Sequence, residues 1–157
     1  MVDEQERKKK IYTPHQARLK AESYCAYQER AQQEVRDKLY EWGLHHEEVE
    51  HLISDLISAN FLNEERFAKA YVLGKFRMKG WGKVKIKLHL KAKRISDPLI
   101  KIAMHEIDID AYESILNKHI EKKYPLGTAN ITLAEKAKLV RHLQSKGFES
   151  DLIFSKI

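Results

Sequence analysis

The strongest constraint on the fold is an apolar pattern that occurs three times along the chain. Its first copy begins at Val35, a shift of 51 residues aligns it with a copy beginning at Ile86, and a further 53 residues lead to a copy beginning at Leu139. A chain with this periodicity buries the apolar face of each unit against its neighbours, so the pattern predicts an elongated array with a long continuous surface. The aligned positions are Val35, Leu39, Leu44 and Val49, then Ile86, Leu90, Ile95 and Ile100, then Leu139, Leu143, Phe148 and Ile153.

The units are predicted to be helical. Apolar residues from Val49 to Ile57 recur at i, i+3, i+4, i+7 and i+8, which is typical of a helix with one buried face. Only six Gly and three Pro occur among 157 residues, and a third of the residues are charged. This composition favours helices over strands. The predicted fold is therefore all-α, built from tandem three-helix repeats.

Helix starts divide this array along the chain. Thr13 before Pro14 places a hydroxyl cap ahead of a proline in the first turn, which is typical of a helix beginning there. The predicted division is a flexible arm over 1–12, an N-terminal helix over 13–29, three-helix repeats over 30–79 and 80–124, and a truncated third repeat over 125–157.

One segment gives conflicting signals. From Lys83 to Lys93 apolar residues alternate with Lys or His, which alone indicates a strand. The repeat alignment places this segment opposite two helical ones, and an isolated strand in a helical array would leave both of its edges unpaired. We therefore expect a helix.

Basic charge is concentrated in the middle of the chain. Residues 66–96 contain eleven Lys or Arg and no Asp or Glu, whereas the rest of the chain carries 18 basic and 23 acidic residues. Ordinary solvated faces mix charges of both signs, because like charges one helical turn apart repel. Although a solvated face remains an alternative, the segment favours a docking surface for an anionic partner.

The helix expected from Lys83 onward would organise part of this charge. At about 100° per residue, Lys83, Lys87, Lys91 and Arg94 fall inside an arc of about 80° and form one basic ridge. Such a ridge could meet nucleic-acid phosphates, an acidic protein face or an anionic membrane. Membrane docking is disfavoured, because the neighbouring apolar residues are needed for the core.

Trp81 lies between two glycines inside the basic segment. Its indole could stack on a base, but a tryptophan in this position is more often a core anchor at a hinge. Both interpretations stay open. Lys85 lies in the same segment and belongs to the candidate surface.

The sequence offers no case for an enzyme, a cofactor or a bound metal. His45, His46 and His51 lie beside three glutamates, but their spacing is not that of the helical metalloprotease motif. Asp108 and Asp110 resemble a carboxylate pair, yet acids at a helix start complement its dipole. Cys25 is the only cysteine, so no intramolecular disulfide can form. With no apolar run near the roughly 18 residues of a membrane span, we expect a cytoplasmic protein.

Residues 61–86 resemble a known signature. The run from Phe61 to Val72, FLNEERFAKAYV, followed by GKFRMKGWGKVKI from Gly74 to Ile86, is similar to the signature of the RecX family of recombinase regulators. That signature has an acid or Asn, Glu, any residue, Arg, an aromatic residue and Ala, then an aromatic–Val pair, a basic stretch with Gly, and a basic helix. The likeness extends more weakly over residues 24–157.

The resemblance implies a curved array of three-helix repeats with no enzymatic activity. Members bind the RecA–DNA filament in its helical groove and modulate strand exchange, ATP hydrolysis and coprotease function, usually by inhibition, in DNA repair and the SOS response. Motif matching carries six cations over as implied contacts, and the resemblance implies no cofactor. We expect the chain to be monomeric. The implied contacts are Arg66, Lys69, Lys75, Arg77, Lys79 and Lys83. A direct, sequence-independent DNA-binding helical-repeat protein is the alternative.

Overall fold

A computed structural model describes residues 11–157, and these residues form nine α-helices and no strand. The all-α prediction is confirmed, and the alternating segment that begins at Lys83 is a helix. The helices are α1 (Pro14–Tyr27), α2 (Gln32–Glu41), α3 (His46–Ser58), α4 (Glu64–Lys79), α5 (Lys83–Ala92), α6 (Asp97–Met104), α7 (Ile109–Lys123), α8 (Leu133–Ser145) and α9 (Ser150–Lys156).

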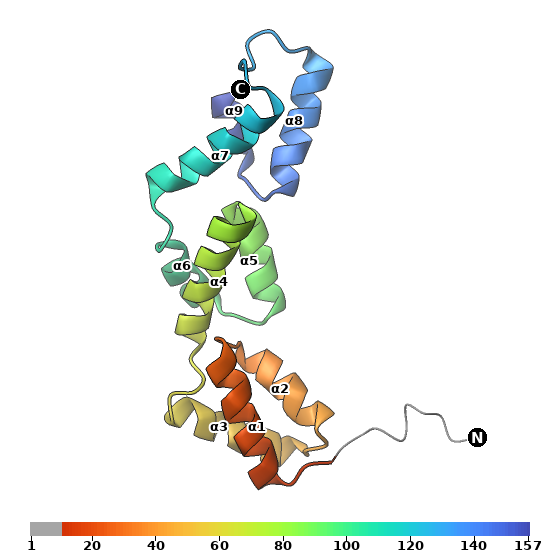
Figure 1. Cartoon of the computed structure of the whole chain (residues 1–157), viewed down its shortest axis with the longest axis vertical. Helices are drawn as coiled ribbons and strands as arrows, with labels where there is room; N and C mark the ends of the chain where they lie inside the picture. Colours follow the sequence, from red (N-terminus) through yellow and green to blue (C-terminus); the bar gives the residue numbers. More distant parts are fainter. Residues whose placement is uncertain (1–10) are drawn as a thin grey trace, which may run out of the picture. The chain divides into compact units, whose positions relative to one another are not determined.

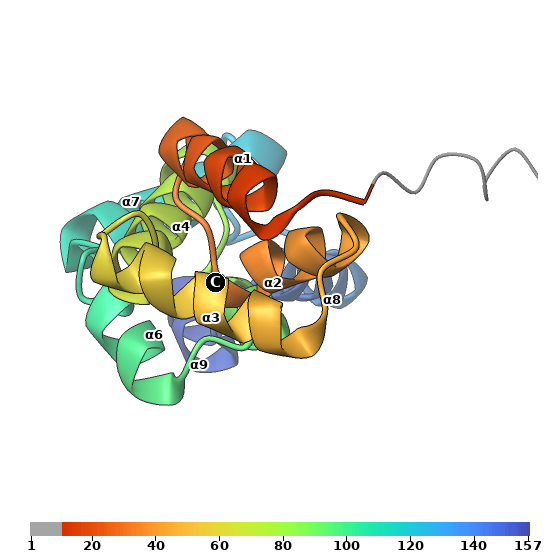
Figure 2. The same ribbon diagram turned by 90° about the horizontal axis from the view of Figure 1, so that it is seen from below.

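The described residues form two compact units. The first runs to Phe67 and includes Lys93–Ile95. In it α1, α2 and α3 lie side by side (Figures 1 and 2), and each of the three contacts the other two. Their facing sides supply a core of small and aliphatic residues. This core consists of Ala17, Ala21, Cys25, Val35, Leu39, Leu44, Val49, Leu52, Ile53, Leu56 and Leu62.

The start of α1 is set by local hydrogen bonds. The Thr13 hydroxyl accepts from the backbone N–H of Gln16 at 3.2 Å, and the Gln16 side chain accepts from the Thr13 N–H at 3.1 Å, forming a capping box. The predicted helix start at Thr13 is confirmed. Of the predicted arm, residues 1–10 lie outside the described part of the chain, and the Tyr12 N–H donates to the carbonyl of Trp42 at 3.0 Å.

The second unit comprises Ala68–Ala92 and Ser96–Ile157. Aromatic residues from three segments meet at its centre. The Tyr112 ring of α7 lies 5.9 Å from Phe76 of α4 and 5.3 Å from Phe148 in the α8–α9 turn, measured between centroids. His119 lies 5.6 Å from Phe148. Because these rings come from distant parts of the sequence, their packing ties α4 and α7 to the C-terminal helices.

Two glycines join the N-terminus of α5 to the turn between α8 and α9. The Gly82 N–H donates to the Lys146 carbonyl at 2.8 Å, and the Val84 N–H donates to the Gly147 carbonyl at 2.9 Å. These bonds satisfy N–H groups that a helix start leaves without partners. The backbones approach so closely that a Cβ added at Gly82 would lie 2.3 Å from the carbonyl carbon of Gly147. Gly147 also has φ +99°, a conformation that favours glycine.

Gly82→Ala is predicted to destabilise the second unit, because the added methyl must push apart two hydrogen-bonded backbones. We expect the free energy of unfolding to fall by about 3 kcal/mol, as for an overpacked core. Gly74→Ala is the matched control, since nothing lies within 4 Å of a Cβ there. This helical glycine should gain about 0.5–1 kcal/mol on substitution. Urea unfolding of the two variants measures both changes. If both variants have the same free energy of unfolding, the close backbone contact at Gly82 is contradicted.

Candidate functional site

The exposed surface of α5 carries its cations in two separate rows. Ile86 and Leu90 are fully buried and mark the inner face. With about 100° between successive residues, Lys83 and Lys87 lie on one side of this face, whereas Lys85 lies on the other side of the helix. Between the two rows the side chains of Val84 and Leu88 are 45% and 63% exposed. The basic helix therefore presents an apolar stripe flanked by lysines.

The exposure of Val84 and Leu88 differs from what the sequence predicted. We expected the apolar residues beside the lysines to be needed for the core, but only alternate ones are buried. The helical turn, rather than the strand-like alternation, decides which of them face inward.

Among the described residues no helix has the length and apolar character needed to cross a membrane.

The predicted ridge ends earlier than expected. α5 stops at Ala92, and Arg94 has φ +60°, in the left-handed region. Arg94 is therefore not on the helix, and its placement on one arc with Lys83 and Lys87 is wrong. The neighbouring Lys93 belongs to the first unit, and its Nζ lies 3.1 Å from the Glu34 carboxylate of the same unit.

Arg66 is held within the first unit. Its Nε donates to the Glu29 carboxylate at 2.8 Å, and its two Nη atoms donate to the side-chain and backbone oxygens of Asn60 at 2.8 and 3.1 Å. This one guanidinium therefore links the end of α1 to the turn that precedes α4. The predicted contact residue is thus also a structural residue.

Other cations of the basic segment are neutralised by carboxylates from outside it. Lys69 lies 3.6 Å from Glu106, and Lys91 lies 3.3 Å from Asp97. A segment without acidic residues in its sequence can thus still have carboxylates from other segments beside its cations. Within residues 11–157, by contrast, no carboxylate forms an ion pair with Lys75, Lys85 or Lys87.

Two of these lysines, Lys75 and Lys85, lie with His89 around the half-buried indole of Trp81. The Nζ atoms of Lys85 and Lys75 lie 4.4 and 5.0 Å from the ring centroid, and the His89 ring lies 4.7 Å away. Cation–π attraction holds the two ammonium groups beside one ring despite their mutual repulsion. The arrangement brings α4 and α5 cations together, at the opposite side of α5 from Lys83.

Lys83 is positioned by the core of the second unit. Its Nζ lies 4.8 Å from the centroid of the Tyr112 ring, and its backbone N–H donates to the Tyr112 hydroxyl at 2.9 Å. That hydroxyl in turn donates to the Glu149 carboxylate at a very short distance. Burial, reinforced by the carboxylate, raises the pKa of the Tyr112 phenol, so it stays a neutral donor.

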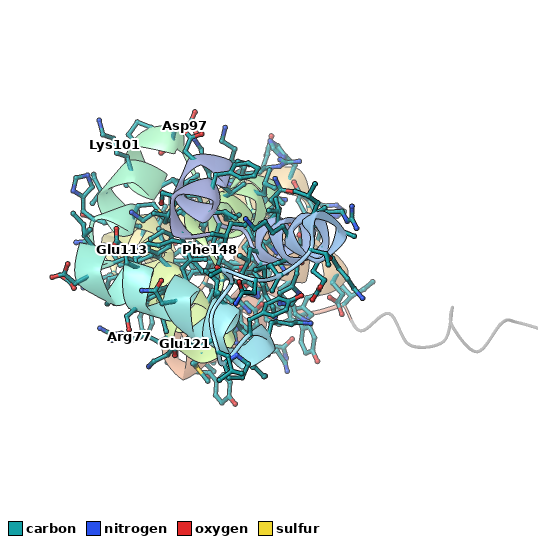
Figure 3. The ribbon with its side chains drawn as sticks, turned by 90° about the horizontal axis from the view of Figure 1, so that it is seen from above. Arg77, Asp97, Lys101, Glu113, Glu121 and Phe148 are labelled. Atoms are coloured by element: carbon teal, nitrogen blue, oxygen red, sulfur yellow. The ribbon has the colours of Figure 1, made fainter. Side chains whose placement is uncertain are left out.

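A groove of about 630 Å³ lies beside the Lys83 row, within the second unit. Sequence reasoning missed the α6 and α7 side of this groove. Lys101 lies one turn after Asp97 on α6, a spacing that could have placed both on one face. Figure 3 shows Asp97 and Lys101 at the same edge of the molecule, while Arg77 lies at the opposite edge of that view. The groove is lined by Lys83, Lys87, Asp97, Ile100, Lys101, Met104, His105, Ile107 and Ile109.

The histidines around the start of α3 make local contacts. The Tyr40 hydroxyl lies 3.0 Å from Nδ1 of His46, and His51 lies 3.4 Å from the Asp55 carboxylate. The backbone N–H of His45 donates to the Glu48 side chain at 3.4 Å. Over the described residues, no three His, Cys, Asp or Glu side chains are grouped as metal ligands would be.

These observations define a class: an all-helical repeat protein with a lysine-rich helix on its surface. Comparison with known proteins narrows the class. Family models described as the first, second and third three-helix domains of RecX match residues 17–56, 63–104 and 110–157. A regulatory protein RecX from Prosthecochloris aestuarii is 31% identical over 134 residues, covering 85% of this chain and 86% of the relative. The chain belongs to the RecX family.

Two further comparisons agree with this assignment. Regulatory protein RecX from Clostridium perfringens (strain 13) is 32% identical over 124 residues, or 78% of this chain, and the match spans only 58% of that relative's length. The crystal structure of RecX from Lactobacillus salivarius has a TM-score of 0.76 at 25% identity, and the match covers 90% of this chain and 92% of that one.

The family models group the helices as α1–α3, α4–α6 and α7–α9. This grouping begins each unit one helix earlier than the phasing predicted from the apolar period, which placed the helix of residues 63–78 in the repeat 30–79. A period gives the length of the repeating unit but does not specify which helix comes first.

Arg66→Met is predicted to lower the free energy of unfolding by about 2 kcal/mol, because it removes charge-assisted hydrogen bonds and leaves the Glu29 carboxylate without its partner. Lys87→Met is the control for loss of a cation at an exposed position, and it should change stability by less than about 0.5 kcal/mol. Chemical denaturation followed by circular dichroism compares them. If both variants unfold at the same denaturant concentration, Arg66 is not a structural link.

Proposed function

We propose that this chain is a regulator of the RecA recombinase that binds the RecA–DNA filament through the basic surface of α4 and α5. Bound there, it inhibits ATP hydrolysis, strand exchange and coprotease activity, and so acts in DNA repair and the SOS response. The proposal rests on membership of the RecX family and on one structural observation. That observation concerns Lys85 and Lys87, which both lie on α5 and form no ion pair with a carboxylate of the described residues.

Electrostatics support this proposal. A nucleoprotein filament presents phosphates and acidic protein groups along a continuous path, which matches a repeat protein with cations on a rigid helix. Lys75 and Lys85 are held close together over Trp81, so a phosphate between them would relieve their repulsion. In this arrangement the Trp81 indole holds the two ammonium groups in place, and phosphate binding does not require a base to stack on the indole.

The proposed complex forms without turnover by the chain itself. Its partners are the recombinase and the phosphates of the DNA, and the complex forms in the cytoplasm. The chain binds as a monomer. The remaining proposed cations, Arg77 and Lys79, lie at the C-terminal end of α4 and are exposed. They would add long-range attraction rather than a fixed contact.

The alternative is a direct, sequence-independent DNA-binding protein that affects recombination only by competing for DNA. The Trp81 cluster favours this alternative, because it could grip bare single-stranded DNA without any protein partner. Neutralising about four phosphates of a single strand would give a log–log salt slope near −3. The two hypotheses differ in whether the filament binds more tightly than its DNA alone.

Lys85→Glu with Lys87→Glu is predicted to weaken filament binding at least about tenfold and to abolish inhibition of filament ATPase, because it places two carboxylates where anions dock. The matched control, Lys138→Glu with Arg141→Glu, makes the same charge change at exposed positions of α8 and should leave inhibition intact. Affinities for preformed filaments and for bare single-stranded DNA are measured by fluorescence anisotropy at several salt concentrations. Equal affinity of the unaltered chain for both would favour the alternative, and inhibition that survives the α5 reversal would exclude this surface.

A further inference from the structure

The groove beside α5 combines a basic rim with an aliphatic floor. Lys83 and Lys87 supply one rim from α5, and Lys101 and His105 supply the other from the end of α6. Its floor is aliphatic, with Ile100 and Ile107 almost fully buried and Met104 partly so. At the N-terminus of α7, Ile109 borders the groove and is 73% exposed.

We propose that this groove binds an acidic segment of the protein partner, with an apolar side chain of that segment anchored on the floor. This inference deepens the function proposed above and rests on it. It assigns the two sides of α5 to different chemistries: the Lys83 row with α6 contacts protein, and the Lys85 row with Trp81 contacts phosphate. The volume, about 630 Å³, is in the range of pockets that hold small-molecule ligands, so an apolar side chain fits within it.

The floor favours protein over nucleic acid. Bases bind to single-strand sites by stacking on aromatic rings, and no aromatic ring other than the His105 imidazole lines this groove. Aliphatic side chains give a base little to stack on, whereas they bury Leu, Ile, Met or Phe side chains well. Protein interfaces have this anatomy, with an apolar centre inside a polar rim.

The carboxylate of Asp97 also favours a protein segment over nucleic acid as the occupant of the groove. This carboxylate lies on the rim, 3.3 Å from Lys91, and Asp97 and Lys101 extend from α6 at the same edge of the molecule (Figure 3). A continuous phosphate chain laid along the groove would pass this carboxylate and be repelled. A peptide can place an acidic residue beside Lys101 and a backbone N–H beside Asp97. The alternation of charge on the rim thus fits a segment whose own groups vary in sign.

The exposure of Ile109 points the same way. As the first residue of α7 it makes no contribution to the buried face, on which Tyr112 and Leu116 lie. Met104 and Ile109 therefore offer apolar surface beside three lysines and His105. Covering them with a partner side chain would bury the apolar surface that the chain leaves in water.

The test uses the full chain and two matched double variants. The groove variant is Lys101→Glu with Ile109→Ser, which leaves the α5 lysines untouched. The control is Lys118→Glu with Ile102→Ser, the same chemical changes at exposed positions of the second unit outside the groove lining. Circular dichroism checks that both are folded, and the single variant Lys101→Glu replaces the double variant if that one is not.

Binding is measured to a preformed RecA filament on oligothymidine and to the oligothymidine alone. We expect the groove variant to lose about tenfold in filament affinity, with its affinity for oligothymidine within about twofold of the unaltered chain. The control should match the unaltered chain in both. A benzophenone side chain introduced at position 109 should cross-link to the protein of the filament and not to the oligonucleotide.

Each other outcome overturns the inference. Equal losses on filament and oligothymidine would make the groove a phosphate site, and no loss on either would leave it outside the interface. Concentration-dependent self-association that disappears in the groove variant would make a second copy of this chain the occupant. In these three cases the proposed function stands. If the unaltered chain does not bind the filament at all, the proposed function fails and this inference fails with it.

Discussion

The placement of α5 depends on a close backbone contact between two glycines. Gly82 and Gly147 bring the start of α5 against the α8–α9 turn, whose carbonyls accept the N–H groups of Gly82 and Val84. No other residue fits there, because a Cβ at either glycine would overlap the opposing segment. The contact fixes the helix in the second unit, so that Ile86 faces inward and the lysines face out. The candidate surface is thus a consequence of packing by residues that carry no charge.

The basic segment contains no acidic residue, but this does not mean that its cations lack acidic partners in the folded chain. In the folded chain, Lys69 and Lys91 are paired with carboxylates that lie later in the sequence, and Arg66 is held by Glu29 and Asn60. The two surface lysine pairs add at most about 1 kcal/mol each to stability, and in all three cases the positive charge is offset locally. The surface that remains for a partner is smaller than the basic segment, and α5 divides it into two sides.

Sequence reasoning predicted the helices well and the site in part. Helical periodicity, Thr13 at a helix start and the small number of glycines and prolines were sufficient for an all-α fold, because these signals act within a few residues. The ion pair of Lys91 with Asp97, the end of α5 before Arg94 and the groove at Lys101 could not be predicted in the same way. The ion pair and the groove depend on where separate helices meet, and the apolar period specifies neither that nor the residue at which a helix ends.

The central claim is that the cations of α5 contact the recombinase filament. Lysine-acetylation footprinting tests it most directly, by comparing the reactivity of each lysine in the free chain and in the filament-bound chain. The account predicts that Lys85 and Lys87 become protected on binding, while Lys138 on α8 reacts as it does in the free chain. Protection confined to α8, with Lys85 and Lys87 equally reactive in both states, would contradict it.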